Sequence, residues 1–377
     1  MMAYASTSVH PQAATGAPPI AVPEDGATYY GVQLAWGTDT PAQYTGRLGR
    51  APMVYGDYVS FPLDNAAKAR ISADVDQAKG THAKLLLALM PNEGLNTVTE
   101  ATARDLGIAL VDYNARGVEI FIRFAHEMNG SWYAWSQQPA RYVIAYRIVA
   151  SAVHRYAPKS AMVWAPNYGG GYPFNTGTYN AKPGTADFVA LDTNHDGVLT
   201  MDDDPYEPYF PGDAYVDWVG LTNYHWGNHL PWGRNELPEP GQFAKQITGT
   251  YDGLLGDQRG VPDFYATYAV NHNKPLALAE TSALYNPDRI DGASNYDIKM
   301  EWARQVFDPG IAAQFPRLKM LLWFEYIKQE EFGTGTVDWR VTYDTAILAG
   351  FQSVLPSRLI FASWQPTDPP LRRGEPW

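Results

Sequence analysis

The sequence predicts an α/β fold, a (β/α)8 barrel with long loops after the fifth and sixth strands. Short apolar runs recur eight times along the 377 residues, and stretches with helical spacing of apolar residues separate several of them. Several runs are continuously apolar, as strands of a parallel sheet covered on both faces are. Eight strands that alternate with helices are typical of a closed parallel barrel.

The expected elements follow from these patterns in chain order. The eight strands are expected at 30–34, 52–59, 84–90, 119–125, 162–165, 216–223, 275–279 and 319–324. Helices with Ala, Leu, Ile and Val at three- and four-residue spacing are expected at 99–114, 139–156, 243–255 and 296–307. The helices after the first two strands are expected to be short. Two long connections rich in Gly and Pro, at 168–215 and 226–242, are expected to shape a substrate site.

The composition is that of a globular chain with one large domain. Charged residues make up 18% and hydrophobic residues 45%, which excludes a disordered protein. We assign residues 28–364 to the barrel, 1–27 to a linker or disordered N-terminal segment, and 365–377 to a C-terminal tail. The chain has no Cys, so disulfides, thiolate metal sites and cysteine catalysis are excluded.

The charge and the aromatic content narrow the class of partner. A net charge of −12 fits neither nucleic acid nor an anionic membrane, because both would repel the chain. No apolar run is long enough to span a membrane, and no signal peptide is visible. The chain has 12 Trp and 25 Tyr, a high aromatic content. Aromatic rings beyond those needed in the core fit a groove in which sugars stack on flat side chains. We expect a monomer that binds neither nucleic acid nor membrane.

Two glutamates stand where barrel enzymes place their chemistry, at the C-terminal ends of strands. Glu127 follows the fourth expected strand by two residues, and Glu280 directly follows the seventh. A carboxylate in such a place is costly to bury unless it is paired or used. A lone Glu at a strand end is more often an ion-pair partner, but two on facing strands favour catalysis. Cleavage of a glycosidic bond needs such a pair, one to protonate the leaving oxygen and one to attack the anomeric carbon.

The surroundings suggest how the two roles divide. An acid needs apolar or negatively charged neighbours, whereas a nucleophile needs hydrogen-bond donors. Tyr224, at the end of the sixth strand, could donate to Glu280, so we expect Glu280 to be the nucleophile and Glu127 the acid/base. If the two carboxyl groups lie about 5–5.5 Å apart, the reaction retains the anomeric configuration. His126 would orient one of the carboxyl groups.

Further residues are assigned to substrate binding or to the surface. Trp132 and Trp323 lie beside the glutamates and would supply stacking faces, although each alone is more often a core residue. Trp226, beside Tyr224, is a further candidate for substrate binding. A charged stretch after the eighth strand is expected to be a solvated loop that contains Glu325, Lys328, Glu330 and Glu331.

The segment 126–135, with the sequence HEMNGSWYAW, resembles the acid/base motif of glycoside hydrolase family 26, best known for endo-β-1,4-mannanases. The segment 210–220 is similar to the family's approach to strand six, and 279–281 matches its nucleophile strand. The resemblance covers about 30–340. It implies a (β/α)8 fold and a retaining double displacement, with Glu127 as acid/base and Glu280 as nucleophile.

The resemblance also implies roles around the two glutamates. His126 is the motif partner, Tyr224 the tyrosine near the nucleophile, Trp132 an aglycone-side platform and Trp323 the platform under the cleaved sugar. The stretch after the strand-eight Trp and the acidic insert after strand five depart from the family pattern. The alternatives therefore include a β-1,3- or mixed-linkage glucanase and a β-1,3-xylanase. A non-catalytic carbohydrate-binding protein is a third class, and a polysaccharide substrate favours an extracellular location.

An acidic loop at 192–203 has the spacing of an EF-hand calcium loop. Its ligands would be Asp192, Asn194, Asp196, the carbonyl of Val198 and Asp203. Position twelve is Asp instead of Glu, which is shorter and should weaken binding, and flanking helices are not evident. The alternative is a solvated acidic turn. Calcium here would be structural, pinning the loop beside the groove, and no cofactor is expected for catalysis.

Overall fold

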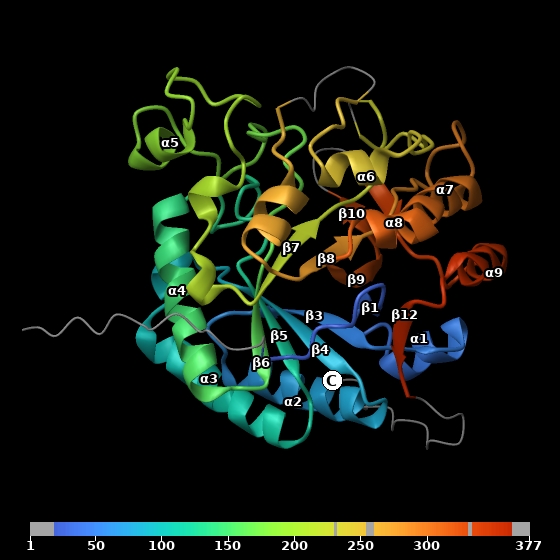
Figure 1. Cartoon of the computed structure of the whole chain (residues 1–377), viewed down its shortest axis with the longest axis horizontal. Helices are drawn as coiled ribbons and strands as arrows, with labels where there is room; N and C mark the ends of the chain where they lie inside the picture. Colours follow the sequence, from blue (N-terminus) through green and yellow to red (C-terminus); the bar gives the residue numbers. More distant parts are fainter. Residues whose placement is uncertain (1–18, 230–231, 254–259, 331–333, 364–377) are drawn as a thin grey trace, which may run out of the picture.

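Eight parallel strands close into a barrel, which confirms the predicted fold class (Figure 1). The structure is a computed structural model that describes residues 19–229, 232–253, 260–330 and 334–363. Strand β1 pairs in parallel with both β3 and β9, and this double pairing closes the barrel. The barrel strands are β1 (Thr28–Leu34), β3 (Val54–Ser60), β4 (Lys84–Met90), β5 (Ile120–Phe124), β6 (Ser160–Trp164), β7 (Trp218–Thr222), β8 (Leu276–Thr281) and β9 (Leu318–Glu325).

Most of the helices cover the outside of the barrel, whereas α5 (Ala186–Leu191) lies in the long loop after β6 (Figure 1). The others are α1 (Pro41–Leu48), α2 (Asn65–Gly80), α3 (Glu100–Ala115), α4 (Pro139–Tyr156), α6 (Gln242–Ile247), α7 (Asn295–Phe307), α8 (Pro309–Gln314) and α9 (Thr345–Val354). Single turns of 3-10 helix occur at η1 (Leu95–Thr97), η2 (Glu207–Tyr209) and η3 (Asp213–Tyr215), and a π-helix, η4 (Tyr265–Asn271), precedes β8. The loops that follow β6 and β7 gather at the top of Figure 1, on one side of the barrel.

Two helix predictions were wrong in length. The helix after the second barrel strand, α2, has 16 residues, and its mostly polar sequence buries only a narrow stripe. The helix expected at 243–255 ends at Ile247 instead, because Gly249 follows with a φ of 65°. A Cβ at Gly249 would lie 2.2 Å from the carbonyl oxygen of Val261, so the chain turns there against a neighbouring segment.

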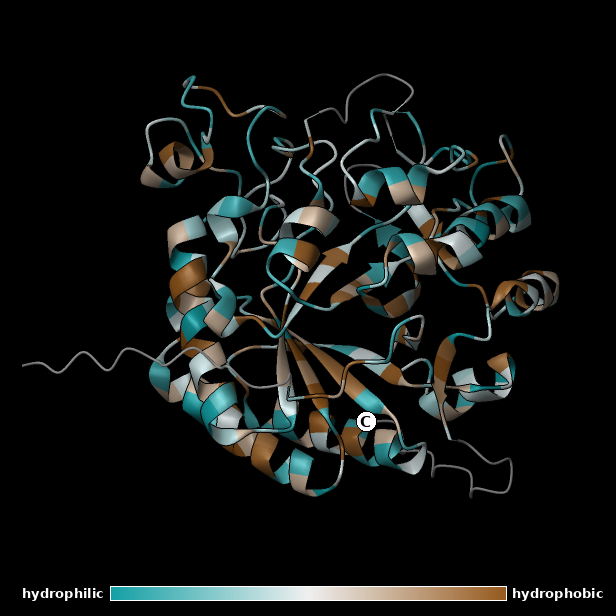
Figure 2. Cartoon of the chain, in the orientation of Figure 1, coloured by the Kyte–Doolittle hydropathy of each residue, from teal (hydrophilic) through white to brown (hydrophobic). Residues whose placement is uncertain are grey.

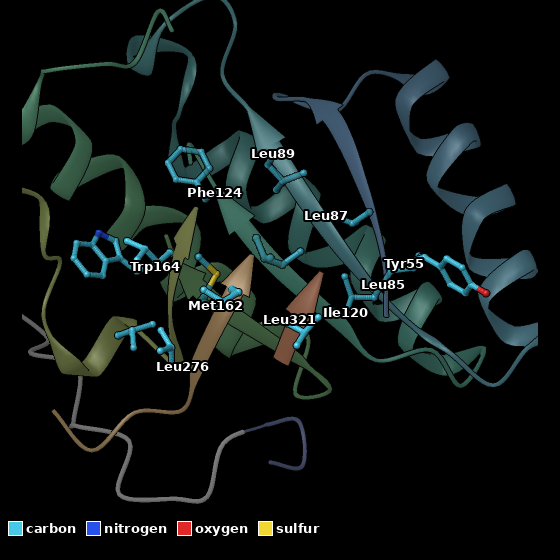
Figure 3. Close-up of a cluster of buried hydrophobic side chains, with 14 of the residues drawn as sticks. Tyr55, Leu85, Leu87, Leu89, Ile120, Phe124, Met162, Trp164, Leu276 and Leu321 are labelled. Carbon is cyan, nitrogen blue, oxygen red and sulfur yellow. The ribbon is translucent and has the colours of Figure 1, made fainter. Parts of the chain in front are cut away.

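The core has two layers, set by the alternation of side chains along each strand. One set of side chains points outward against the helices, including Leu85, Ile120, Met162 and Leu321 (Figure 3). The other set fills the barrel interior, as in barrels of this class. The strands are accordingly apolar along most of their length, whereas the helices alternate between polar and apolar faces (Figure 2). The interior set includes Tyr29, Val54, Leu86, Phe121, Ala161, Val163, Trp218, Ala277, Met320 and Leu322.

Residues 19–27, which the sequence analysis assigned to a linker, close the floor of the barrel. The side chain of Ile20 is fully buried among the interior residues, and Val22 packs beside it. The Tyr29 hydroxyl donates to the carbonyl of Ala21 over 2.9 Å, and Lys319 donates to the carbonyl of Glu24. The linker assignment was therefore wrong for this part, while residues 1–18 and the expected tail at 365–377 lie outside the described residues.

Two further strands extend the barrel sheet, and two others form a separate sheet. At the floor, β12 (Leu359–Ala362) pairs with β1 and with β2 (Ala51–Pro52). After β9 the chain forms an antiparallel hairpin of β10 (Ile327–Glu330) and β11 (Gly335–Asp338). No helix in the described parts of the chain is long and apolar enough to cross a membrane.

Glu325 was wrongly placed in a solvated loop. It is the last residue of β9 and is buried, and its carboxylate accepts hydrogen bonds from the backbone N–H groups of Val341 and Thr342. The Thr342 hydroxyl donates to the same carboxylate. These bonds attach the segment after β11 to the end of β9. Of the other residues expected in that loop, Lys328 is half exposed, Glu330 is partly buried, and Glu331 lies outside the described residues.

If Ile20 seals the floor, the Ile20→Ala variant should lose about 2–4 kcal/mol of unfolding free energy, because it leaves a cavity in a packed interior. Urea unfolding followed by far-UV circular dichroism measures this loss. Ile290→Ala is the matched control, since the Ile290 side chain is fully exposed. Equal stability of the Ile20→Ala variant and the wild-type protein would show that the segment lies on the barrel without stabilising it.

Candidate active site

The turn after β5 holds Glu127 in a strained conformation. Ala125 and Glu127 have φ values of 45° and 54°, in the left-handed region that non-glycine residues rarely adopt. The surrounding structure fixes both, because the N–H of Ala125 donates to Leu89 on β4 and the N–H of Glu127 donates to Ala165. Strain of this kind is concentrated at functional sites, where neighbouring packing compensates for it. The turn directs the Glu127 side chain into the mouth of the barrel.

Glu127 is buried and holds its proton up to neutral pH. Its carboxyl oxygen Oε2 accepts a hydrogen bond of 3.0 Å from the indole N–H of Trp132. Burial and the negative charge of Glu280 raise the pKa of Glu127 to about 7, against the opposing effects of Arg123 and Trp132. Trp132 itself is half-buried, so part of its ring faces the mouth.

Glu280 is surrounded by hydrogen-bond donors. It lies near the end of β8, and its carboxylate accepts from the buried guanidinium of Arg123 on β5 and from the hydroxyl of Tyr224 after β7. Burial alone would raise the pKa of Glu280, but the charge of Arg123 and the hydroxyls of Tyr224 and Tyr58 lower it to about 2. The hydrogen bond from Tyr224 is the one that the sequence analysis expected.

Arg123 is the functional residue that sequence reasoning missed. It is fully buried at an inward-facing position of β5, two residues after Phe121, and also donates to the hydroxyl of Thr222 on β7. A cation inside an apolar barrel is stable only with a partner of opposite charge. The signal in the sequence was an arginine in the middle of an otherwise apolar strand, which required a buried carboxylate nearby.

His126 is buried beside the two glutamates and is neutral. Burial and the charge of Arg123 lower the pKa of His126 to about 3. Its ring packs against the rings of Tyr58, Tyr133 and Trp135, at centroid distances of 5.5, 5.1 and 5.7 Å. The indole N–H of Trp135 donates to the His126 carbonyl over 2.7 Å, which fixes the start of the turn. His126 is therefore neutral and packs among aromatic rings beside Glu127.

Aromatic residues from three segments line the mouth around Tyr224. The rings of Phe324 and Trp339 lie 5.6 and 4.9 Å from the ring of Tyr224, and Trp226 packs edge-on against Trp339 at 5.0 Å. Trp226, Tyr58 and Tyr326 are only partly buried, so their rings reach the surface of the mouth. Flat rings here can stack against sugars. Trp226 thus lies at the mouth, and its role in substrate binding stays a prediction.

Trp323 is not at the mouth, so its predicted role as a sugar platform is wrong. Its side chain is fully buried and packs against Phe351 on α9 at 4.8 Å and Phe307 on α7 at 6.3 Å. On β9 the inward positions are Met320, Leu322 and then Phe324. Trp323 therefore points to the helices, and Phe324 is the strand-nine ring that faces the mouth.

The loop after β6 borders the acid/base side of the site. The side chain of Asn129 donates to the carbonyl of Asn167 and accepts from its N–H, both over 2.8 Å. Phe174 packs edge-on against Trp132 with ring centroids 5.3 Å apart. This loop and the turn after β5 thus form one wall beside Glu127.

The acidic loop at 192–203 is closed by its own backbone. The Asp192 carboxylate accepts from the N–H groups of Asp196 and Gly197, and that of Asp203 accepts from Thr193 and Thr200. The side chain of Asn194 accepts from the N–H of Asp196, and Asp196 accepts from Val198. Among the described residues, no group of three or more His, Asp or Glu side chains is arranged so that it could hold a metal ion. Calcium binding stays a prediction.

Solved structures share the fold of this chain. A double mutant of endo-β-1,4-mannanase from Cellulomonas fimi superposes with a TM-score of 0.53 at 16% identity, over 91% of this chain and 74% of the mannanase. A Bacillus subtilis mannanase, BCman, gives a TM-score of 0.50 at 14% identity, over 94% and 98% of the two chains. The enzyme GH26A from Muricauda sp. gives 0.50 at 14% identity, over 89% and 92%. The chain thus resembles glycoside hydrolase family 26 in fold.

Sequence comparison adds a curated relative. Endoglucanase H from Acetivibrio thermocellus is 22% identical over 251 residues, which are 65% of this chain and 21% of the relative. The chain therefore spans about a fifth of the length of the curated relative that it matches. No family model matches the sequence.

The calcium prediction can be tested by melting. If the loop binds calcium, adding the ion to chelator-treated protein should raise the melting temperature by mass action, because the ion binds only the folded loop. In the Asp192→Ala variant this rise should be absent. Differential scanning calorimetry measures both, with magnesium as the control ion. A melting temperature that does not respond to calcium in the wild-type protein would show that the loop is a solvated acidic turn.

Proposed function

We propose that this protein is a retaining glycoside hydrolase that cleaves β-linked polysaccharide by double displacement. The observation that carries the proposal is the pair of buried carboxyl groups at the mouth, Glu127 in the turn after β5 and Glu280 on β8. Burial and the charge of Glu280 raise the pKa of Glu127 to about 7, whereas Arg123 and Tyr224 lower that of Glu280 to about 2. When the surroundings shift the pKa values of two carboxyl groups in opposite directions, one group can act as the acid and the other as the ionised nucleophile. Between these pKa values, the pair is in the protonation state that the first step needs.

In the first step, the Glu280 carboxylate attacks the anomeric carbon while the bond from that carbon to the glycosidic oxygen breaks. Glu127 transfers its proton to the departing oxygen, so the leaving sugar departs as a neutral alcohol. The sugar that stays is bound covalently to Glu280. Before the attack, Arg123 donates to one oxygen of the Glu280 carboxylate and the Tyr224 hydroxyl donates to the other. The donors thus hold the carboxylate in one orientation for attack.

In the second step, water replaces the leaving sugar. Glu127, now ionised, takes a proton from the water as its oxygen attacks the anomeric carbon, and the bond to Glu280 breaks. This returns Glu127 to its protonated form and Glu280 to its carboxylate. Because Glu280 no longer carries its negative charge in the intermediate, one cause of the raised pKa of Glu127 is removed. The acid of the first step thereby becomes the base of the second.

The favoured substrate is a β-1,4-mannan cleaved within the chain. Two of the solved structures that share the fold are named mannanases, and aromatic rings at the mouth of this barrel suit pyranose stacking. The name of the curated relative, an endoglucanase, favours a β-glucan as the second candidate. β-1,3-Xylan is a further alternative. Action on such polymers goes with an extracellular location, and we propose that the chain works as a monomer without a cofactor for catalysis.

A polysaccharide panel tests the proposed function. Galactomannan, glucomannan, lichenan, laminarin and β-1,3-xylan are incubated with the protein, and new reducing ends are measured. We expect turnover on the mannans, with products of several lengths if cleavage is internal. Turnover on lichenan or laminarin alone would move the assignment to a glucanase. Binding to a polymer without any new reducing ends would support a carbohydrate-binding protein instead.

The two glutamates are tested by substitution and rescue. Glu280→Ala and Glu127→Ala should each lose at least about a thousandfold in kcat, because each removes a group that acts on the reacting bond. Azide should rescue Glu280→Ala with inverted product, and Glu127→Ala on an activated aryl glycoside with retained product. Nuclear magnetic resonance of the glycosyl azides identifies the anomer. Near-full activity of either folded variant would show that the assignment is wrong.

A further inference from the structure

A buried lysine stands behind the proposed nucleophile. Lys299, on α7, is fully buried. Its ammonium donates to two backbone carbonyls, those of Ala283 and Asp338, the latter over 2.6 Å. Burial lowers the pKa of Lys299 to about 7, so its charge is costly in this place. If α7 only covered the barrel, an apolar residue at this position would avoid the free-energy cost of burying a charge.

The two carbonyls belong to segments that both reach the active site. Ala283 follows Glu280 by three residues, on the segment that continues β8, and Asp338 ends β11 and precedes Trp339. The Ser282 hydroxyl also donates to the carbonyl of Trp339 over 2.7 Å, and the N–H of Asp338 donates to the carbonyl of Tyr285. The hydrogen bonds of Lys299, Ser282 and the N–H of Asp338 thus connect these segments, and we call this network the clasp.

The clasp fixes the position of Trp339. The Trp339 ring packs against Tyr224, the tyrosine that donates a hydrogen bond to Glu280. The Trp339 ring is almost fully buried, and its indole N–H donates to Glu330 on β10 over 2.7 Å. The Tyr224 ring lies 4.9 Å from it, and the Tyr224 hydroxyl donates to Glu280. The Lys299 ammonium itself lies 5.8 Å from the Trp339 ring centroid. A continuous chain of contacts therefore connects Lys299 to the Glu280 carboxylate.

We propose that Lys299 is a positioning residue, which acts through Trp339 and Tyr224 to hold Glu280 in the orientation for attack. The inference rests on the proposed function, since it assigns a role toward the nucleophile of that reaction. Lys suits the task because its compact ammonium has three donors that can serve carbonyls from separate segments. Its loss leaves two carbonyls without their donor and frees Trp339 to shift away from Tyr224.

A double-mutant cycle tests the proposal on the full chain. Lys299→Met should lower kcat about tenfold or more on the best polysaccharide of the panel, while KM stays within about twofold. The reason is that the hydrogen bond from Tyr224 to the charged Glu280 carboxylate is weakened. In the Tyr224→Phe background the same substitution should change kcat little, since the route to Glu280 is already cut. Lys274→Met is the control: Lys274 also donates to a backbone carbonyl, that of Asp213, but at an exposed place.

Independent, multiplying effects of Lys299→Met and Tyr224→Phe on kcat would overturn the proposal and leave Lys299 with a structural role. If Lys299→Met fails to fold, Ser282→Ala replaces it in the cycle, since it removes one bond of the same clasp. The same cycle is measured in urea unfolding, where coupling between the two sites is also expected. A wild-type protein that cleaves no glycan would contradict the proposed function, and the unfolding cycle would still decide whether the two sites are coupled.

Discussion

The ion pair between Arg123 and Glu280 is the interaction on which the rest of the site depends. It joins β5 to β8 across the barrel and is buried on both sides. Arg123 holds the Glu280 carboxylate ionised, and that negative charge in turn helps to keep the proton on Glu127. One buried cation therefore sets the protonation states of two neighbouring glutamates in opposite directions. Burial makes the arrangement costly to assemble, but it also strengthens each electrostatic effect inside the mouth.

The fold, and the position of Glu127 and Glu280 at the barrel mouth, could be predicted because they depend on regular patterns. Continuous apolar strands specify a barrel, and a barrel places the ends of its strands at one mouth. The position of Trp323 could not be predicted this way, because a shift of one residue turns a side chain to the opposite face. The pairing of β8 with β9 is irregular between Leu278 and Thr281, just before this point. Strand alternation, and not the presence of a tryptophan, decides that Phe324 faces the mouth.

Other features depend on contacts between segments that the sequence does not reveal. The partner of Arg123 lies 157 residues along the chain. The left-handed turn at Ala125 and Glu127 is held by bonds to β4 and to the segment after β6. The burial of Glu325 likewise comes from a segment beyond the hairpin, at Val341 and Thr342. In each case the residue finds partners on segments that come together only when the barrel forms.

The floor of the barrel has a consequence for how the chain can be made. Ile20 and β1 are the first described parts to be synthesised, yet the strand that closes against β1 is β9. The Thr28 hydroxyl bonds to the carbonyl of Leu318, 290 residues later. Contacts of such separation slow folding, because a long loop must be closed before they form. During translation β1 can pair with β3 early, but its other edge and the floor contacts around Ile20 lack their partners until β9 has left the ribosome.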